Sequence, residues 1–204
     1  MTYGGDFYDT IAAGSIESAR VVAPIVHEQF TPATVVDVGC GQGHWGAAFA
    51  ELGANVTGID GDYVTGQRIP FAAHNLEQPL PDIGRFDLAI CLEVAEHLPA
   101  DRAAPFVGEL CALADTVLFS AAIPHQTGAG HINLRWQSYW ADLFADNGRN
   151  VSGSIRWKVW DDDRVEPWYR QNLLIATTSK IRHTGPMDVV HPVIHEWGRR
   201  SPLR

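Results

Sequence analysis

The sequence predicts an α/β fold in which a mostly parallel sheet carries helices on both faces. Apolar runs typical of buried strands alternate with helical patterns between residues 34 and 121. That order favours parallel strands joined by crossover helices. Polar residues follow several of these runs, at the edge of the sheet where such folds bind their ligands. A glycine-rich turn follows the first run, which adds a third sign of a ligand-binding edge.

The first predicted elements are a helix over residues 15–30 and a strand over 34–38. Ser15 is the expected N-cap of this helix. Thr31–Pro32 ends it, because proline disfavours the helical conformation in the residue before it.

The later elements alternate in the same way, and Gly53 is the expected C-terminal cap of the second helix. In order they are a helix at 45–52, strands at 55–60, 71–74 and 86–91, a helix at 100–114, a strand at 116–121, an amphipathic helix at 135–147, and strands at 151–159 and 172–178.

We expect residues 1–180 to form a single domain, in which 1–31 supplies an N-terminal lid and helix. The aromatic side chains proposed for the lid are Tyr3, Phe7 and Tyr8. Residues 181–204 form a C-terminal tail that lacks a periodic pattern and is rich in proline. We expect this tail to become ordered on contact with a partner or with a second subunit in a homodimer.

Charge and composition restrict the partners. The formal net charge of −9 counts against bare nucleic acid, because nucleic-acid binders carry a basic face. No apolar run approaches the roughly 20 residues needed to cross a bilayer, and the N-terminus does not read as a signal peptide. The three cysteines read as reduced thiols, which predicts a cytoplasmic protein. The negative charge makes a small molecule the expected partner.

The segment 35–44 reads VVDVGCGQGH and is the most informative stretch of the chain. Its glycines, Gly39, Gly41 and Gly43, lie between a strand and a helix, where the absence of Cβ atoms lets the backbone approach a ligand. The N-terminus of the following helix offers N–H groups and a partial positive charge. The turn therefore suits an anionic or strongly polar group.

Asp60 ends the second strand, where a carboxylate can accept both hydroxyls of a ribose. The glycine turn and this carboxylate together indicate a cofactor that contains a nucleoside. A dinucleotide site prefers the spacing GxGxxG, whereas this chain has GxGxG.

At this point the sequence resembles the class I S-adenosylmethionine (SAM)-dependent methyltransferases of the small-molecule type. VVDVGCGQG is similar to the first motif of that family, and Asp60 occupies the position of its acidic residue. FAAHNLEQPL at 71–80, FDLAICLEVAEHL at 86–98 and VLFSA at 117–121 follow in the family's order. The resemblance covers residues 34–122 by motifs and extends to about residue 178 by the order of elements.

The resemblance implies a Rossmann-like sheet of seven strands, mostly parallel, with helices on both faces and an antiparallel last strand. It implies SAM as the cofactor and S-adenosylhomocysteine (SAH) as the product, with 1–180 as the SAM-binding domain. The acceptor would be a small molecule with an oxygen, nitrogen or carbon nucleophile. The cofactor-binding residues would be Asp37, Gly39, Cys40, Gly41, Gly43, Asp60, Gly61, Asn75, Leu76, Leu92 and Glu93.

Catalysis needs a group that positions the acceptor and removes its proton. Glu93 follows the fourth strand, and His125 and His131 lie in a glycine-rich loop after the fifth. An imidazole in such a loop has little structural use. These three residues are therefore the predicted catalytic groups, with His131 preferred over His125.

A metal site is the alternative use of this region. The pattern Glu-x-x-Glu-His with a later histidine is similar to the metal site of the small-RNA 2′-O-methyltransferases. By that similarity, Glu93, Glu96, His97 and His131 would hold a divalent ion. Because the pattern LEVAEHL is also common in methyltransferases that use no metal, we do not predict a metal here.

Three other functions compete with small-molecule methyl transfer. They are a metal-dependent RNA 2′-O-methyltransferase, a nicotinamide-dependent oxidoreductase and a SAM-binding module without turnover. The negative charge counts against the first, and the GxGxG spacing counts against the second.

Overall fold

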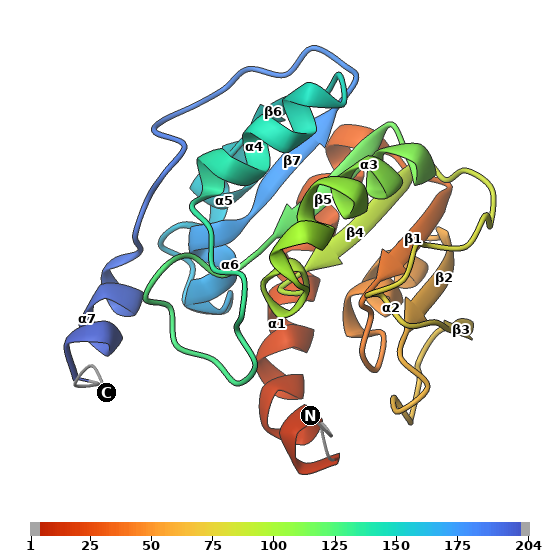
Figure 1. Cartoon of the computed structure of the whole chain (residues 1–204), viewed down its shortest axis with the longest axis horizontal. Coiled ribbons are helices and arrows are strands. Elements are labelled where there is room, and N and C mark those ends of the chain that lie inside the picture. The colour runs from red at the N-terminus through yellow and green to blue at the C-terminus, as the bar shows by residue number, and fades with distance from the viewer. Residues whose placement is uncertain (1–4, 201–204) are drawn as a thin grey trace.

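The computed structural model describes residues 5–200, with side chains from 13 to 199. One sheet of seven strands runs in the order β3–β2–β1–β4–β5–β7–β6 (Figure 1). The strands are β1 (Thr34–Val38), β2 (Asn55–Asp60), β3 (Phe71–Ala73), β4 (Leu88–Leu92), β5 (Thr116–Ser120), β6 (Asn150–Ser152) and β7 (Leu174–Thr177).

The described helices are α1 (Gly5–Phe30), α2 (His44–Glu51), α3 (Ala103–Leu113), α4 (Gln137–Asp146), α5 (Ser154–Val159), α6 (Pro167–Asn172) and α7 (Pro192–Arg200). Two 3-10 turns, η1 (Ala95–His97) and η2 (Ala100–Arg102), lie between β4 and α3. None of the helices in this described part of the chain has the length and apolar character needed to span a bilayer.

The sheet has the predicted direction of strands. β1, β2, β3, β4 and β5 pair in parallel, whereas β7 runs antiparallel to both of its neighbours, β5 and β6. The prediction of a seven-stranded, mostly parallel sheet with an antiparallel last strand is therefore confirmed. The parallel strands all end at one edge, and this edge gathers the predicted site residues.

Alternate residues of each strand supply two apolar layers, because successive side chains of a strand face opposite sides. Val35 and Leu118 pack in the layer that contains α1, α2 and α5, whereas Val36 and Phe119 pack in the layer that contains α3 and α4. The two layers bury both faces of the sheet, which explains why the strands read as continuous apolar runs.

The N-terminal helix begins earlier than predicted. α1 starts at Gly5, so Ser15 lies inside the helix and is not its N-cap. The Ser15 hydroxyl instead lies 3.4 Å from the Tyr169 hydroxyl, so packing against α6 replaces the predicted capping role. The lid residue Tyr3 and the side chains of Phe7 and Tyr8 lie outside the described residues.

The segment 151–159 is not a single strand as predicted. β6 ends at Ser152, and after Gly153 the chain forms α5. Ile155 and Val159, four residues apart, are both buried on one side of this helix. A short apolar run is ambiguous between strand and helix, and here the spacing of four residues prevails.

In its described part, the tail beyond Lys180 packs against the domain. The Arg156 guanidinium donates to the carbonyl oxygens of Pro186 (2.7 Å) and Met187 (2.6 Å). The Asp188 carboxylate accepts from the Ser138 hydroxyl (2.8 Å), and His191 is buried. α7 then completes the described chain, next to α6, through a contact of the Trp168 and Trp197 rings.

Two isoleucines test the packing of the sheet. Ile175 is fully buried between β5 and β6, whereas Ile132 is 62% exposed. We expect Ile175→Ala to lower the free energy of unfolding by about 2–5 kcal/mol, because the removed atoms leave a cavity. Ile132→Ala, the matched control, should change it by less than about 0.5 kcal/mol. Urea unfolding measures both, and equal losses would contradict the described core.

Candidate functional site

A cavity of about 1050 Å³ opens at the carboxyl ends of β1, β2 and β4. Its walls come from the glycine turn after β1, the end of β2, the loops after β3, β4 and β5, and helix α6. Segments from across the chain therefore meet at one edge, as the parallel sheet requires.

The glycine turn adopts the conformation that its sequence predicts. Gly39 and Gly43 both have positive φ, of 77° and 80°, which side chains with a Cβ rarely tolerate. A Cβ at Gly39 would also overlap the side chain of Val94, and one at Gly43 would lie 2.7 Å from Ile69 Cγ1. Gly43 is the N-cap of α2, so the N-terminus of that helix begins beside the turn.

Asp60 joins the glycine turn to the end of β2. Its Oδ2 accepts a hydrogen bond from the Gly41 N–H (2.7 Å), and its Oδ1 accepts from the Gly61 N–H (2.6 Å) and the Tyr63 hydroxyl (3.0 Å). A carboxylate offers about four acceptor directions, so these three donors leave room for a further hydroxyl donor. Asp60, Gly41, Gly61 and Tyr63 all line the cavity.

Asp37 and Gly43 do not line the cavity, although they were predicted to bind the cofactor. The buried Asp37 carboxylate accepts from the Gly46 N–H (2.9 Å) and so braces the first turn of α2. Burial raises the pKa of Asp37 to about 7. Asp37 and Gly43 therefore support the turn from the side that faces away from the cavity.

The other predicted cofactor-binding residues all lie on the wall: Gly39, Cys40, Asn75, Leu76, Leu92 and Glu93. The Asn75 side-chain oxygen Oδ1 accepts from the Glu77 N–H (3.0 Å), which fixes the loop after β3. Burial raises the pKa of the Cys40 thiol, so this group stays protonated at neutral pH.

Glu93 follows β4 with a φ of 56°, a conformation that is uncommon outside glycine. Its N–H is held by Ser120, at 2.9 Å from the carbonyl oxygen and 3.1 Å from the hydroxyl. Its carboxylate accepts from the side-chain amides of Asn172 (3.1 Å) and Gln126 (3.2 Å). Burial raises the pKa of Glu93 to about 7.

Glu96, His97 and His131 meet at the same end of the cavity. Each offers one ligand atom, and the three atoms lie within 4.8 Å of one another. Glu96 is fully buried, and its pKa is raised first by burial and then by the charge of Glu93. Burial lowers the pKa of both imidazoles, which are therefore neutral at pH 7. Three of the four residues of the metal alternative thus cluster, and Glu93 is not among them.

His125 does not reach the cavity, unlike His131. Both histidines belong to the loop after β5, but His125 is exposed and has a φ of 69°, whereas His131 lines the wall. The His131 Nδ1 lies 3.2 Å from the Gln126 carbonyl oxygen, which fixes the ring. Of the two predicted histidines, only His131 is in position to contact a ligand.

Sequence reasoning missed the buried amides Gln171 and Asn172. They lie at the end of α6 and before β7, and they connect to Glu93 and Gln126 by hydrogen bonds. The available signal was a polar pair directly before an apolar strand, because buried polar groups require partners. The aromatic pair Trp45 and Tyr169 also lies on the cavity wall, where the Trp45 indole N–H donates to the Tyr169 hydroxyl (3.2 Å).

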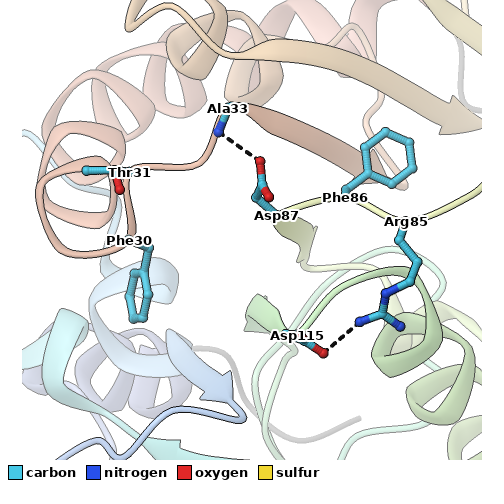
Figure 2. Close-up of a pocket in the computed structure, with 7 residues that line it drawn as sticks. All are labelled: Phe30, Thr31, Ala33, Arg85, Phe86, Asp87 and Asp115. Atoms are coloured by element: carbon cyan, nitrogen blue, oxygen red, sulfur yellow. Dashed lines mark hydrogen bonds and ion pairs between the residues drawn. The ribbon is translucent and has the colours of Figure 1, made fainter.

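Figure 2 shows a second hollow, of about 540 Å³, at the opposite edge of the sheet. Its polar groups already satisfy one another: the Asp87 carboxylate accepts from the N–H groups of Ala33 (3.0 Å) and Thr34 (2.8 Å). Arg85 likewise pairs with Asp115 (2.6 Å). These contacts join the amino ends of β1, β4 and β5, whereas most of the predicted site residues lie at the opposite edge.

The buried Asp37 predicts a pH dependence of stability. The pKa of this carboxyl is about 7 in the folded protein and near 3.8 in an unfolded chain. Between these values the folded state retains a proton that the unfolded state has lost, so stability decreases as pH rises from about 4 to about 7. The slope contributed is up to about 1.4 kcal/mol per pH unit.

Asp37→Asn cannot ionise and should remove this part of the slope while keeping an acceptor for the Gly46 N–H. Urea unfolding of both proteins between pH 4.5 and 8 measures the difference, in which other carboxyl groups cancel. Parallel curves for the two proteins would contradict the prediction.

With this geometry, the chain can be compared with known proteins. A family model for a methyltransferase domain matches residues 16–145. The chain is 37% identical over 81 residues to a ubiquinone biosynthesis O-methyltransferase of Colwellia psychrerythraea, covering 32% of the chain and 31% of that relative. A relative of the same name from a Methylobacterium species is 34% identical over 100 residues, covering 44% and 39%. The chain thus spans only about three to four tenths of the length of these relatives.

Solved structures show the same fold. A magnesium protoporphyrin IX methyltransferase from Synechocystis with bound SAM superposes with a TM-score of 0.60, at 24% identity and over 83% of the chain and 82% of that structure. An amino pentose methyltransferase from Micromonospora echinaspora, also with bound SAM, gives a TM-score of 0.64 at 15% identity, over 84% and 96%. Since the family model covers most of the chain and these structures share its sheet, the chain belongs to the methyltransferase-domain family and has the class I methyltransferase fold.

Proposed function

We propose that the protein transfers a methyl group from SAM to a small-molecule acceptor. The observation that carries this proposal is the single cavity of about 1050 Å³. One part of its wall offers the glycine turn and Asp60, and another part offers Glu93 and the imidazoles of His97 and His131. A polar cofactor and a proton acceptor are thereby supported in one cavity.

The glycine turn would hold the amino-acid part of the cofactor, because its N–H groups and the start of α2 favour a carboxylate. Asp60 would accept a ribose hydroxyl, with Tyr63 sharing the same carboxylate. Asn75 and Leu76 would bracket the adenine. When bound, SAM supplies an electrophilic methyl carbon and a neutral leaving group.

His131 is the proposed proton acceptor. Its Nδ1 faces the Gln126 carbonyl oxygen, which accepts a hydrogen bond but cannot donate one. The ring proton therefore lies on Nδ1, and Nε2 retains the lone pair. Burial keeps the ring neutral by lowering its pKa. While the acceptor's nucleophile forms its bond to the methyl carbon, its proton would pass to Nε2 of His131.

The charges of the cavity support an acceptor without phosphate or carboxylate groups. Among the described wall residues there is no lysine or arginine, whereas five are acidic: Asp60, Asp62, Glu77, Glu93 and Glu96. An anionic acceptor would therefore find no lysine or arginine partner on the described part of this wall. This feature counts against an RNA end as the substrate and supports a neutral or cationic small molecule.

A divalent cation is the second candidate for the acceptor end of the cavity. It is favoured by the clustering of Glu96, His97 and His131 within 4.8 Å, together with the complete burial of Glu96. One carboxylate and two imidazoles are suitable ligands for a transition metal. A metal would hold the acceptor oxygen and lower its pKa.

A cytoplasmic location and a homodimer also remain predictions.

The cofactor proposal predicts binding of SAH to the isolated protein. We expect calorimetry to detect binding of SAH to the wild-type protein. The substitution Asp60→Asn should weaken the affinity for SAH at least about tenfold, which corresponds to about 1.4 kcal/mol of binding free energy. The physical reason is the loss of a charged acceptor for the ribose.

Asp142→Asn, an exposed residue of α4, is the matched control and should bind SAH like the wild type. Binding of NAD with no binding of SAH would overturn the proposal in favour of an oxidoreductase. Binding of SAH without release of SAH from SAM across an acceptor panel would leave only the SAM-binding module.

The assignment of His131 predicts a loss of turnover without a loss of cofactor affinity. With hydroxyl acceptors of the catechol type, we expect His131→Gln to lower SAH release by about 10²–10⁴-fold, because proton transfer is lost. His125→Gln, an exposed histidine of the same loop, is the matched control. Repeating the assay with and without Mn²⁺ distinguishes a bound metal from His131 as the base. Wild-type activity that requires the ion supports the metal, whereas activity that does not require it supports His131 as the base. Equal activity of both variants and the wild type would contradict both.

A further inference from the structure

Three amide side chains form a buried cluster behind Glu93. Gln126, Gln171 and Asn172 are 8%, 0% and 1% exposed. The Gln171 Nε2 donates to the Gln126 Oε1 and to the Asn172 Oδ1, both at 2.9 Å. In addition, the Asn172 Nδ2 donates to the Gln126 Oε1 (3.1 Å). Buried amides of this kind are held by their hydrogen bonds, so the direction of each bond matters.

The direction of this cluster is set mainly by one backbone group, and the Ile123 N–H adds a longer contact of 3.4 Å to the Gln126 Oε1. An amide side chain has a donor end and an acceptor end, and its two orientations have almost the same shape. The His191 backbone N–H, which can only donate, lies 2.9 Å from the Gln171 Oε1. The oxygen of Gln171 must therefore face His191, and its NH₂ group must face Gln126 and Asn172.

The same reasoning continues to Glu93. Because Gln171 presents its NH₂ group, Gln126 and Asn172 must turn their oxygens toward it. Their own NH₂ groups then face the Glu93 carboxylate, at 3.2 Å and 3.1 Å. With Gln171 reversed, the two amides would present oxygens to the Glu93 carboxyl group, and while that group is ionised it has no hydrogen to donate to them.

His191 belongs to the carboxy-terminal segment, defined here as residues 186–191. This segment is fixed by polar contacts on both sides of the cluster. Arg156 holds the carbonyl oxygens of Pro186 and Met187, and Gln137 donates to the Val189 carbonyl oxygen (3.0 Å). The His191 Nε2 lies 3.0 Å from the Trp160 carbonyl oxygen. The donor that orients Gln171 is therefore held in one place.

We propose that the carboxy-terminal segment is a working part of the site, and that Gln171 is a positioning residue through which the His191 N–H sets the direction of the hydrogen bonds at Glu93. Gln171 itself does not line the cavity and acts through Gln126 and Asn172. The inference concerns the site of the proposed function, but its test does not require methyl transfer.

The test is the NMR signals of the side-chain NH₂ groups of Gln126 and Asn172 in ¹⁵N-labelled full-length protein, assigned with Gln126→Glu and Asn172→Asp. In the wild type both groups should exchange slowly with solvent, because both donate to a buried carboxylate. His191→Pro removes the backbone N–H, whereas His191→Ala, the matched control, removes the ring and keeps that N–H. We expect loss of the protected NH₂ signals in His191→Pro and their retention in His191→Ala.

Gln171→Met gives a second, independent arm, because methionine has a similar shape and no hydrogen bonds to direct. It should lose the same two signals, while the backbone spectrum far from the cluster stays unchanged. Wild-type NH₂ signals in Gln171→Met, or in a folded His191→Pro, would overturn the proposal. Loss of the signals in His191→Ala as well would assign the effect to the ring and also overturn it. SAH binding, measured on the same samples, reports separately on the proposed function.

Discussion

The hydrogen bond from the Gly41 N–H to the Asp60 carboxylate is the contact on which the site depends. It joins the turn after β1 to the end of β2, two neighbouring parallel strands whose carboxyl ends meet at one edge. Glycine is needed in this turn, since a Cβ at Gly39 would overlap the side chain of Val94. The parallel sheet brings the segments together, and the short backbone-to-carboxylate bond fixes their relative position.

Buried acidic groups form the second constraint. Asp37, Glu93 and Glu96 lie at the same edge of the sheet, and burial raises the pKa of each. The chain stabilises two of them with donors: the Gly46 N–H for Asp37, and the amides of Gln126 and Asn172 for Glu93. Because the pKa of Glu93 is raised to about 7, this carboxyl group can exchange protons near pH 7, which suits acid–base chemistry.

Much of the fold could be predicted because its signals are local. β1 and β2 have the predicted bounds, since a buried strand followed by glycines and an acidic residue carries its own markers. α5 was missed because the run at 151–159 fits both periodicities over so short a length. Within the site, the sequence named both His125 and His131, with His131 preferred, and the path of the loop brings only His131 to the cavity wall. Gln171 and Asn172 were not predicted as site residues for another reason, because their hydrogen-bond partners, such as Gln126, lie far away along the chain. The assignment of ligand-binding roles to particular wall residues stays a prediction.

Ile69 explains a pattern of glycines that the chain alone does not. A Cβ at Gly43 would lie 2.7 Å from this side chain, one at Gly46 2.6 Å and one at Gly58 2.9 Å. Three glycines, from a turn, a helix and a strand, therefore all face Ile69, although Val56 also crowds Gly46 (2.9 Å) and the Cys40 Sγ also crowds Gly58 (2.7 Å). A smaller residue at position 69 would relieve only part of the crowding at the helical and strand positions, and Gly43 would stay glycine because of its backbone angle.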